Sequence, residues 1–170
     1  MTRRLTVALA TIAVFAGAAC AQRASLAVGA ALPAGDFTSS AGTGIDAAFQ
    51  IRTEPMIGPL SLRIELGYDH FAGRDTTSST TMSVEAVSLT GAFGSMFYWA
   101  AGPGYYQSNR TTQISGHNVN DQRNYLGAQA ALGVNIPVFR WEGFLEVSAA
   151  KLFAPGPTIM YVPLRFGMRL

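Results

Sequence analysis

Charged residues are scarce in this sequence, and the residue types on which several function classes depend are almost absent. Aspartate, glutamate, lysine and arginine make up 13% of the 170 residues, and Lys151 is the only lysine. The single cysteine, Cys20, excludes a disulfide framework and a cysteine-based metal site. His70 and His117 lie far apart, and no glycine-rich loop leads into a lysine and a helix. We therefore expect no metal, no cofactor and no phosphate-binding motif.

One long apolar run is present, and it lies at the N-terminus. Arg3 and Arg4 precede the apolar segment Leu5–Phe15, and small residues follow as far as Ala21. This order is typical of a secretory signal peptide that is cleaved after Ala21. A lipoprotein signal, in which Cys20 would be acylated, is the alternative. The sequence lacks the leucine that such signals usually carry three residues before the cysteine.

Residues 1–21 are thus expected to be a signal peptide, and residues 22–170 a single domain. Of the 12 lysines and arginines, two lie in the signal, which leaves 10 basic against 10 acidic residues in the domain. The near-zero net charge gives no reason to expect a nucleic-acid partner. No later segment reaches the 18 or so apolar residues of a spanning helix.

Period-two alternation of apolar and polar residues recurs along the domain and is clearest at its C-terminus. There Met160, Val162, Leu164, Phe166, Met168 and Leu170 share one face, whereas the other face carries Arg165 and Arg169. Such repeats, separated by turn residues, predict an all-β fold, a single eight-stranded antiparallel up-and-down transmembrane β-barrel. A break in the alternation near Ala86 suggests a β-bulge, and Pro103 an irregular strand. The expected strands are 24–31, 45–52, 60–69, 82–93, 96–107, 125–134, 140–148 and 160–170.

The expected connections alternate between short and long. Short turns are expected at Thr53–Pro59, Gly94–Ser95 and Asn135–Val138, and longer loops at Leu32–Gly42, Ala72–Thr81 and Ser108–Arg123; Ala154–Pro157 is short where a long loop is expected. Outer-membrane barrels have short periplasmic turns, so both termini are expected on the periplasmic side. An aromatic girdle at the membrane interfaces is also expected, from Tyr68, Phe71, Phe97, Trp99, Tyr105, Tyr106, Trp141, Phe153 and Tyr161.

The polar faces carry opposite charges that a hairpin register brings together. If the last two strands pair around Ala154–Pro157, opposed residue numbers sum to 311, so that Glu146 faces Arg165 and Glu142 faces Arg169. An eight-stranded barrel is only wide enough for its own side chains. We therefore expect a charge ladder that plugs the lumen, made of Arg63, Glu65, Glu142, Glu146, Arg165 and Arg169. The alternative is that these are rim residues in water, each pair contributing less than about 1 kcal/mol.

The chain resembles small outer-membrane β-barrel proteins of the OmpA/OmpX-like family in three segments. These match the first, fifth and last strands of that family and are Val28–Phe37, Tyr98–Tyr106 and Val162–Leu170. The resemblance implies residence in the outer membrane of a Gram-negative-type bacterium, with outer-membrane lipid as a partner. It also implies insertion by the outer-membrane assembly machinery, which reads a C-terminal strand ending in an aromatic residue. This chain departs from that pattern, because it ends in Leu170 and its last aromatic residue is Phe166.

The sequence leaves four functions open. We expect a monomeric barrel with a structural or surface-interaction role, with a surface ligand at the long outer loops and no enzymatic activity. A narrow pore is the second reading. A soluble periplasmic carrier, with its apolar face around an apolar ligand, is the third; the single lysine argues against an open aqueous surface. A lipid-acting enzyme is the fourth and would use His70 with Asp69, Asp75 and nearby serines.

Overall fold

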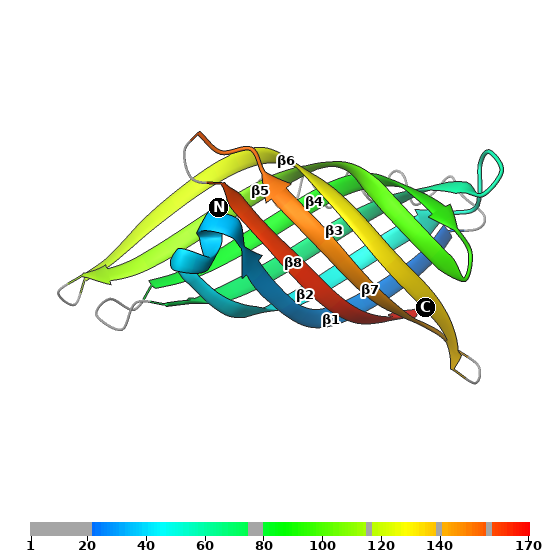
Figure 1. Cartoon of the computed structure of the whole chain (residues 1–170), viewed down its shortest axis with the longest axis horizontal. Helices are drawn as coiled ribbons and strands as arrows, with labels where there is room; N and C mark the ends of the chain where they lie inside the picture. The colour runs from blue at the N-terminus through cyan, green and yellow to red at the C-terminus, as the bar shows by residue number, and fades with distance from the viewer. Residues whose placement is uncertain (1–21, 75–79, 115–116, 139–140, 156–157) are drawn as a thin grey trace.

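A computed structural model describes residues 22–74, 80–114, 117–138, 141–155 and 158–170, so the expected signal peptide lies outside the described residues. Eight antiparallel strands follow one another around a closed barrel, and the last strand pairs with the first (Figure 1). The predicted all-β, up-and-down barrel is therefore confirmed. No helix in the described part of the chain is long and apolar enough to cross a membrane.

Seven of the eight strands are longer than the alternation alone predicts, and β8 keeps its predicted length. They are β1 (Gln22–Ala34), β2 (Ala41–Thr53), β3 (Leu60–Gly73), β4 (Thr80–Gly94), β5 (Phe97–Ile114), β6 (His117–Val138), β7 (Trp141–Leu152) and β8 (Ile159–Arg169). A short 3-10 helix, η1 (Gly35–Ser39), connects β1 to β2. At one end the main chain is closed by the hydrogen bond from Leu170 N to Ala24 O, 2.8 Å long. We name this end periplasmic and the other end outer, after the orientation expected from the sequence.

The apolar face of each strand points away from the barrel axis. Leu132 and Val28, for example, are 63% exposed, whereas the inward residues Arg63, Glu65 and Arg165 are at most 5% exposed. The alternation therefore assigned the two faces correctly. A carrier with an apolar interior would need the opposite arrangement, so the structure argues against the soluble-carrier reading.

The expected β-bulge near Ala86 is wrong. The β3–β4 register runs without a shift from Leu60 opposite Phe93 to Ala72 opposite Thr81. Met82, Val84 and Ala86 all point inward, and the lumen is apolar at this level. The alternation of apolar and polar residues changes along β4 because its inward residues are apolar toward one end and polar toward the other. The backbone itself stays regular. A register shift occurs instead in β2, between Ala41 and Gly44.

Pro103 interrupts pairing as expected, because proline has no N–H to donate. The β4–β5 ladder lacks pairs between Ser88–Gly104 and Gly91–Ala101, yet its register is the same on both sides of the gap. On its other side Pro103 lies opposite Ala128 of β6 in an unbroken register.

The predicted loop Ser108–Arg123 is also wrong. Both of its halves are strand, because β5 and β6 stay paired as far as Ile114 opposite His117. This hairpin projects beyond the other strands at the outer end of the barrel (Figure 1). The predicted loop Leu32–Gly42 contracts to η1 and its flanks, and most of the connection in Ala72–Thr81 lies outside the described residues.

Inward glycines make room for aromatic rings. A side chain on Gly133 of β6 would meet the ring of Tyr98 on β5, and one on Gly167 of β8 would meet the ring of Phe144 on β7. The ring of Tyr106 likewise lies against Gly104. Each ring fills the space that a side chain on the glycine would take, so small and large residues interlock inside the narrow barrel.

Replacing Gly133 by valine is expected to lower the free energy of unfolding by about 1–3 kcal/mol, because overpacking would displace Tyr98. Urea unfolding of the protein folded in lipid vesicles, followed by intrinsic fluorescence, would measure this loss. The matched control is Ala130→Val, on the outward face of the same strand, with a change below about 0.5 kcal/mol. Equal effects of the two substitutions would contradict the inward packing.

Candidate functional site

A network of buried charged side chains crosses the middle of the lumen. Strand alternation turns Arg63 and Glu65 of β3, Asp46 of β2, Glu146 of β7 and Arg165 of β8 inward, and each is at most 5% exposed. Because the barrel is closed, residues from strands far apart in sequence meet across its interior. Ionised groups removed from water in this way are stable only when they are paired and hydrogen-bonded.

Arg165 is the centre of the network. Its Nε and Nη2 donate to the two oxygens of Asp46 at 2.7 and 2.8 Å, a bidentate geometry that gives strong hydrogen bonds. Its Nη1 lies 2.8 Å from Glu65 Oε1 and 3.4 Å from Glu146 Oε1. Gly29 of β1 lies between Asp46 and Arg165 in the strand register, and its lack of a side chain leaves this path clear.

Arg63 forms the second half of the network. Its Nη1 is ion-paired with Glu146 Oε2, and its Nη2 lies 3.5 Å from Glu65 Oε2. Its Nε donates to the hydroxyl of Thr90 on β4 at 3.1 Å. Each guanidinium is thus paired with two or more carboxylates, and these come from different strands.

Neutral side chains satisfy the remaining carboxylate oxygens. Tyr98 of β5 donates its hydroxyl to Glu146 Oε2 at 2.9 Å. Gln50 of β2 and Gln129 of β6 donate to the two oxygens of Glu65, each at 3.0 Å. The network therefore ties together β2 to β8 and leaves little room in the middle of the lumen.

Glu142 and Arg169 lie apart from this network, at the periplasmic mouth. Arg169 Nη1 lies 2.7 Å from Glu142 Oε2, and Arg23 bonds the same oxygen at 3.2 Å. The side chain of Glu142 is 52% exposed. The β7–β8 register is the predicted one, with opposed numbers that sum to 311, but at this level the pair borders an open vestibule of about 520 Å³ that Arg52 also lines.

An aromatic column fills the lumen at the outer end. Phe37 of η1 contacts Phe71 edge to face, with ring centres 5.1 Å apart, and Phe71 contacts Tyr161 in the same way at 5.5 Å. Phe71, Tyr106 and Tyr161 were expected in the membrane girdle, and this expectation is wrong because all three are buried. Phe37 was not singled out from the sequence.

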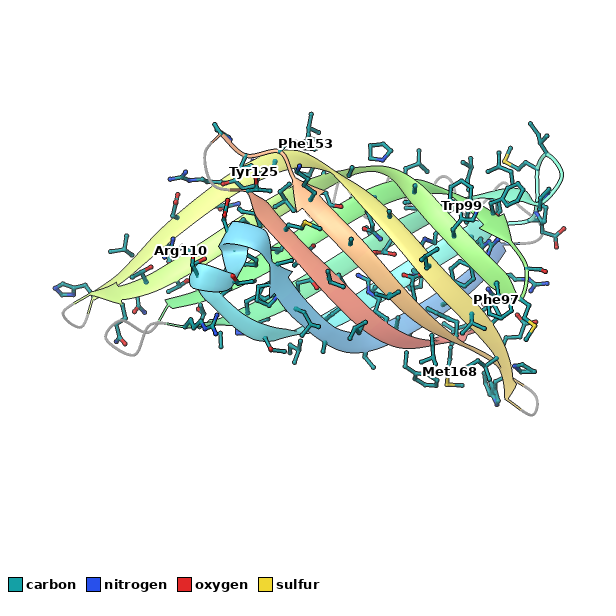
Figure 2. All side chains as sticks on the ribbon, in the orientation of Figure 1. Phe97, Trp99, Arg110, Tyr125, Phe153 and Met168 are labelled. Carbon is teal, nitrogen blue, oxygen red and sulfur yellow. The ribbon has the colours of Figure 1, made fainter. Side chains whose placement is uncertain are left out.

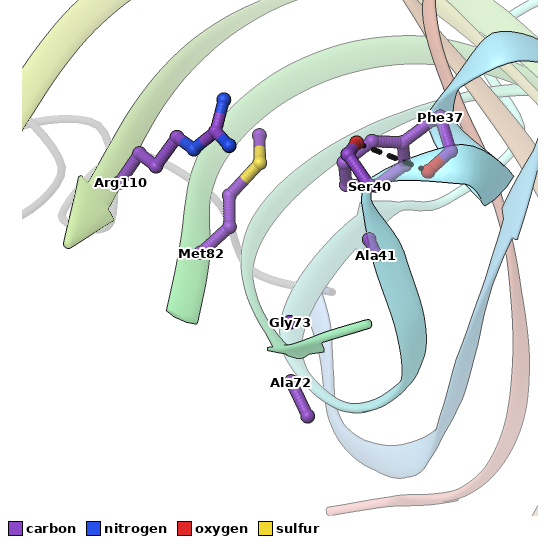
Figure 3. A pocket seen from close by; sticks show the side chains of 7 residues that line it. All are labelled: Phe37, Ser40, Ala41, Ala72, Gly73, Met82 and Arg110. Carbon is purple, nitrogen blue, oxygen red and sulfur yellow. Dashed lines mark hydrogen bonds between the residues drawn. The ribbon is translucent and has the colours of Figure 1, made fainter. Parts of the chain in front are cut away.

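Figure 3 shows the small pocket beside this column, between η1 and the ends of β3, β4 and β5, with Arg110 and Met82 on neighbouring strands. Its volume is about 20 Å³, which is room for about one water molecule. The outer mouth thus offers no pocket here for an organic ligand.

The other six expected girdle residues are exposed on the outward face: Tyr68, Phe97, Trp99, Tyr105, Trp141 and Phe153. In Figure 2, Phe97 and Trp99 lie toward one end of the barrel and Phe153 toward the other. Tyrosine and tryptophan favour the interface between hydrocarbon and water. The positions of these residues fit two interfacial belts.

The residues considered for catalysis do not come together. Asp69 is buried in the lumen, whereas His70, the next residue along β3, points outward. Asp75 lies outside the described residues. No cluster of three or more histidine, cysteine, aspartate or glutamate residues suited to a metal ion occurs in the described ranges.

Sequence reasoning missed half of the lumen network. Asp46 and Gln50 stand at inward positions of the 45–52 alternation, which was the available signal. The register of the β7–β8 hairpin predicts only the partners of Glu142 and Glu146. It does not reveal the contact of Asp46 with Arg165 or that of Gln50 with Glu65. For Tyr98, Thr90 and Gln129 the sequence indicates only that their positions in the alternation place them on the inward face.

A closed eight-stranded up-and-down barrel with an apolar outward face and an interior narrow enough to hold its own side chains is the fold of the small OmpA/OmpX-type outer-membrane barrels. The sequence matches no established family profile and no curated protein. Neisserial surface protein A is similar in structure, with a TM-score of 0.57 and 11% identity over 88% of this chain and 95% of that chain. A major outer membrane protein from Thermus thermophilus gives 0.56 and 14% over 89% and 100%, and Ail of Yersinia pestis 0.54 and 10% over 89% and 100%.

Replacing Arg165 by methionine is expected to lower the free energy of unfolding by about 3–5 kcal/mol, because it leaves Asp46 buried and unpaired. Replacing Arg169 by methionine, the matched control on the same strand, is expected to cost less than about 1 kcal/mol because its partner is half exposed to water. Urea titration in lipid vesicles would compare the two. Similar losses would show that the lumen is hydrated throughout.

Proposed function

We propose that the protein is a monomeric barrel of the outer membrane of a Gram-negative-type bacterium, closed to ions, which presents the β5–β6 hairpin as an interaction surface. The fold and its apolar outward face support residence in outer-membrane lipid. β8, which closes the barrel against β1, is the strand that the outer-membrane assembly machinery would read. The observation that carries the interaction role is an unpaired strand edge on the projecting hairpin.

That edge belongs to the outer half of β6. β6 is paired with β5 from His117 onward, but its pairing with β7 begins only at Gly127 opposite Leu152. Leu126 O accepts a hydrogen bond from Phe153 N, and no described residue pairs with the same edge of His117–Tyr125. A strand edge of this kind is a template for another chain.

The edge carries few of the features that usually block strand addition: its charged residues are Asp121 and Arg123, which form an ion pair with each other. Because main-chain groups alternate in direction and Leu126 faces β7, the N–H groups of Asn118, Asn120, Gln122 and Asn124 face the open side. The register from His117 to Tyr125 contains no bulge, and the segment contains neither proline nor lysine. An extended polypeptide that adds as a further strand is the partner that this geometry fits.

A sulfated glycan is a weaker candidate for this hairpin. Ail has been crystallised with the heparin analogue sucrose octasulfate. Here Arg123 is ion-paired with Asp121 at 2.9 Å, and Arg110 of β5 lies opposite the same aspartate, so this acidic side chain lies between the two arginines. Unpaired main-chain groups, rather than charge, distinguish this surface.

The lumen network and the aromatic column support a barrel without a pore. Below the column, Arg165 and Arg63 bridge carboxylates from opposite walls. A continuous aqueous path would require these bonds to break. Arg52, which lines the periplasmic vestibule, hydrogen-bonds to Ser61 and lies over the Tyr98 ring.

The native protein is expected to fractionate with the outer membrane, because its outward face suits lipid. Its detergent extracts should migrate differently on gels before and after boiling, since a closed barrel stays compact until heated. Membrane fractionation and electrophoresis would show both. Release into the soluble periplasm would contradict the proposed location.

In a planar lipid bilayer, the protein is expected to give no conductance steps because the lumen is filled. Replacing both Arg63 and Glu146 by alanine removes the two members of one ion pair together, so that neither is left without the other. This double variant is expected to give transient conductance steps. Regular steps from the unaltered protein would favour the narrow-pore reading.

Gln122→Pro is expected to abolish polypeptide binding at the hairpin, because it removes an N–H on the open edge and leaves pairing with β5 in place. The control Gln122→Ala keeps the N–H and should bind normally. Nanodisc-embedded protein would be applied to arrays of extended peptides, with amide hydrogen exchange as a second readout. Peptides that bind both variants equally would refute strand addition.

A further inference from the structure

The lumen holds more negative than positive charge. Among the described residues, four acidic side chains are buried, Asp46, Glu65, Asp69 and Glu146, against two arginines, Arg63 and Arg165. Three of these acids are hydrogen-bonded to a guanidinium. The fourth, Asp69, is not, and it is this residue that the network leaves without compensation.

Asp69 is 1% exposed, and neither of its carboxylate oxygens has a hydrogen-bond partner. The hydroxyl of Tyr106, on β5, is buried and also without a partner. An ionised carboxylate in such a place is costly, because it has lost its water and gained no donor that satisfies it.

Charged and titratable groups reach Asp69 from several strands. β2 places Asp46 directly opposite, and β4 places the apolar Val84 there. β8 contributes Arg165 and Tyr161, which both interact with the Asp69 carboxyl, and β5 contributes Tyr106. Glu65 lies four residues away along β3 and also faces inward. Arg165 is the only cation in this set, and it is already shared among three other carboxylates.

We propose that Asp69 binds a proton in the folded barrel and is a neutral carboxylic acid there. Both oxygens of Asp46 accept hydrogen bonds from Arg165, whereas neither oxygen of Asp69 has a partner, so Asp69 is the member of the pair that takes the proton. The carboxylic O–H can then donate to the carboxylate of Asp46, which lies directly opposite on β2. Asp69 lies at the boundary between the aromatic column and the charged network, where a neutral polar group fits both sides.

A proton bound on folding makes stability depend on pH. In the unfolded chain Asp69 is ionised above about pH 4. Wherever Asp69 is protonated in the folded barrel and ionised in the unfolded chain, the folded state holds one proton more, and stability falls as pH rises. One proton corresponds to about a tenfold change in the unfolding equilibrium constant per pH unit.

The test compares Asp69→Asn, which mimics the neutral acid, with the unaltered protein in urea titrations in lipid vesicles at several pH values. The difference between them is expected to follow the one-proton slope, with the variant relatively more stable at higher pH. Parallel pH profiles would overturn the proposal. Replacing sodium and potassium by choline is expected to change nothing; a loss of stability in choline, confined to the unaltered protein, would show a bound metal cation instead.

Infrared spectroscopy gives a readout that does not depend on the variant folding. At neutral pH the unaltered protein is expected to show the carbonyl band of a protonated carboxylic acid, and labelling aspartate with carbon-13 should shift it. Asp46 and Asp69 are the aspartates buried in the described lumen, and Asp46 is bonded to Arg165. Absence of a shifted acid band would overturn the proposal.

Discussion

Pairing of β8 with β1 is the constraint on which the rest of the structure depends. Hydrocarbon offers no hydrogen-bond partner to a strand edge, so a sheet within it must close on itself. Eight strands close around an interior that holds only side chains. The inward residues therefore pack against one another, and the chain meets this requirement with three layers: the aromatic column at the outer end, the charged network in the middle and the open vestibule at the periplasmic end.

Arginine at position 165 suits the middle layer because a guanidinium presents donors in several directions within one plane. It contacts carboxylates from β2, β3 and β7 at once. A shorter or more compact cation would satisfy fewer of them. Burying so much charge does not by itself stabilise the barrel, since desolvation offsets much of the attraction between the ions. The network instead makes any arrangement that separates its members costly, which favours a single strand register.

Local periodicity predicts the features that depend on one strand at a time, and prediction fails where the surroundings of a strand change. Alternation identified the strands and their faces, and one hairpin register placed Glu146 opposite Arg165. The contact of Arg165 with Asp46 depends on barrel closure across β1, which no local pattern reveals. The sequence of Ser108–Arg123 predicts a loop because both faces of the hairpin are polar, as suits strands that leave the membrane. Phe71, Tyr106 and Tyr161 were assigned to the girdle because aromatic residues suit both an interface and a packed lumen.

The open edge of β6 has the same physical origin as the closed barrel. Where lipid surrounds the strands, each edge is paired; beyond it, water satisfies main-chain groups and the requirement for closure lapses. β7 ends at Leu152, whereas β6 extends outward as far as His117. The outer stretch of β6 is paired with β5 on one edge and unpaired on the other. Water can satisfy the main-chain groups of the unpaired edge, and an added polypeptide strand would bind the same groups in its place. In the described part of the lumen, side chains occupy the outer and middle layers and leave no comparable unpaired strand edge. The proposed interaction role therefore falls on the projecting hairpin, where main-chain groups are unpaired, and the paired charges of the interior favour one strand register.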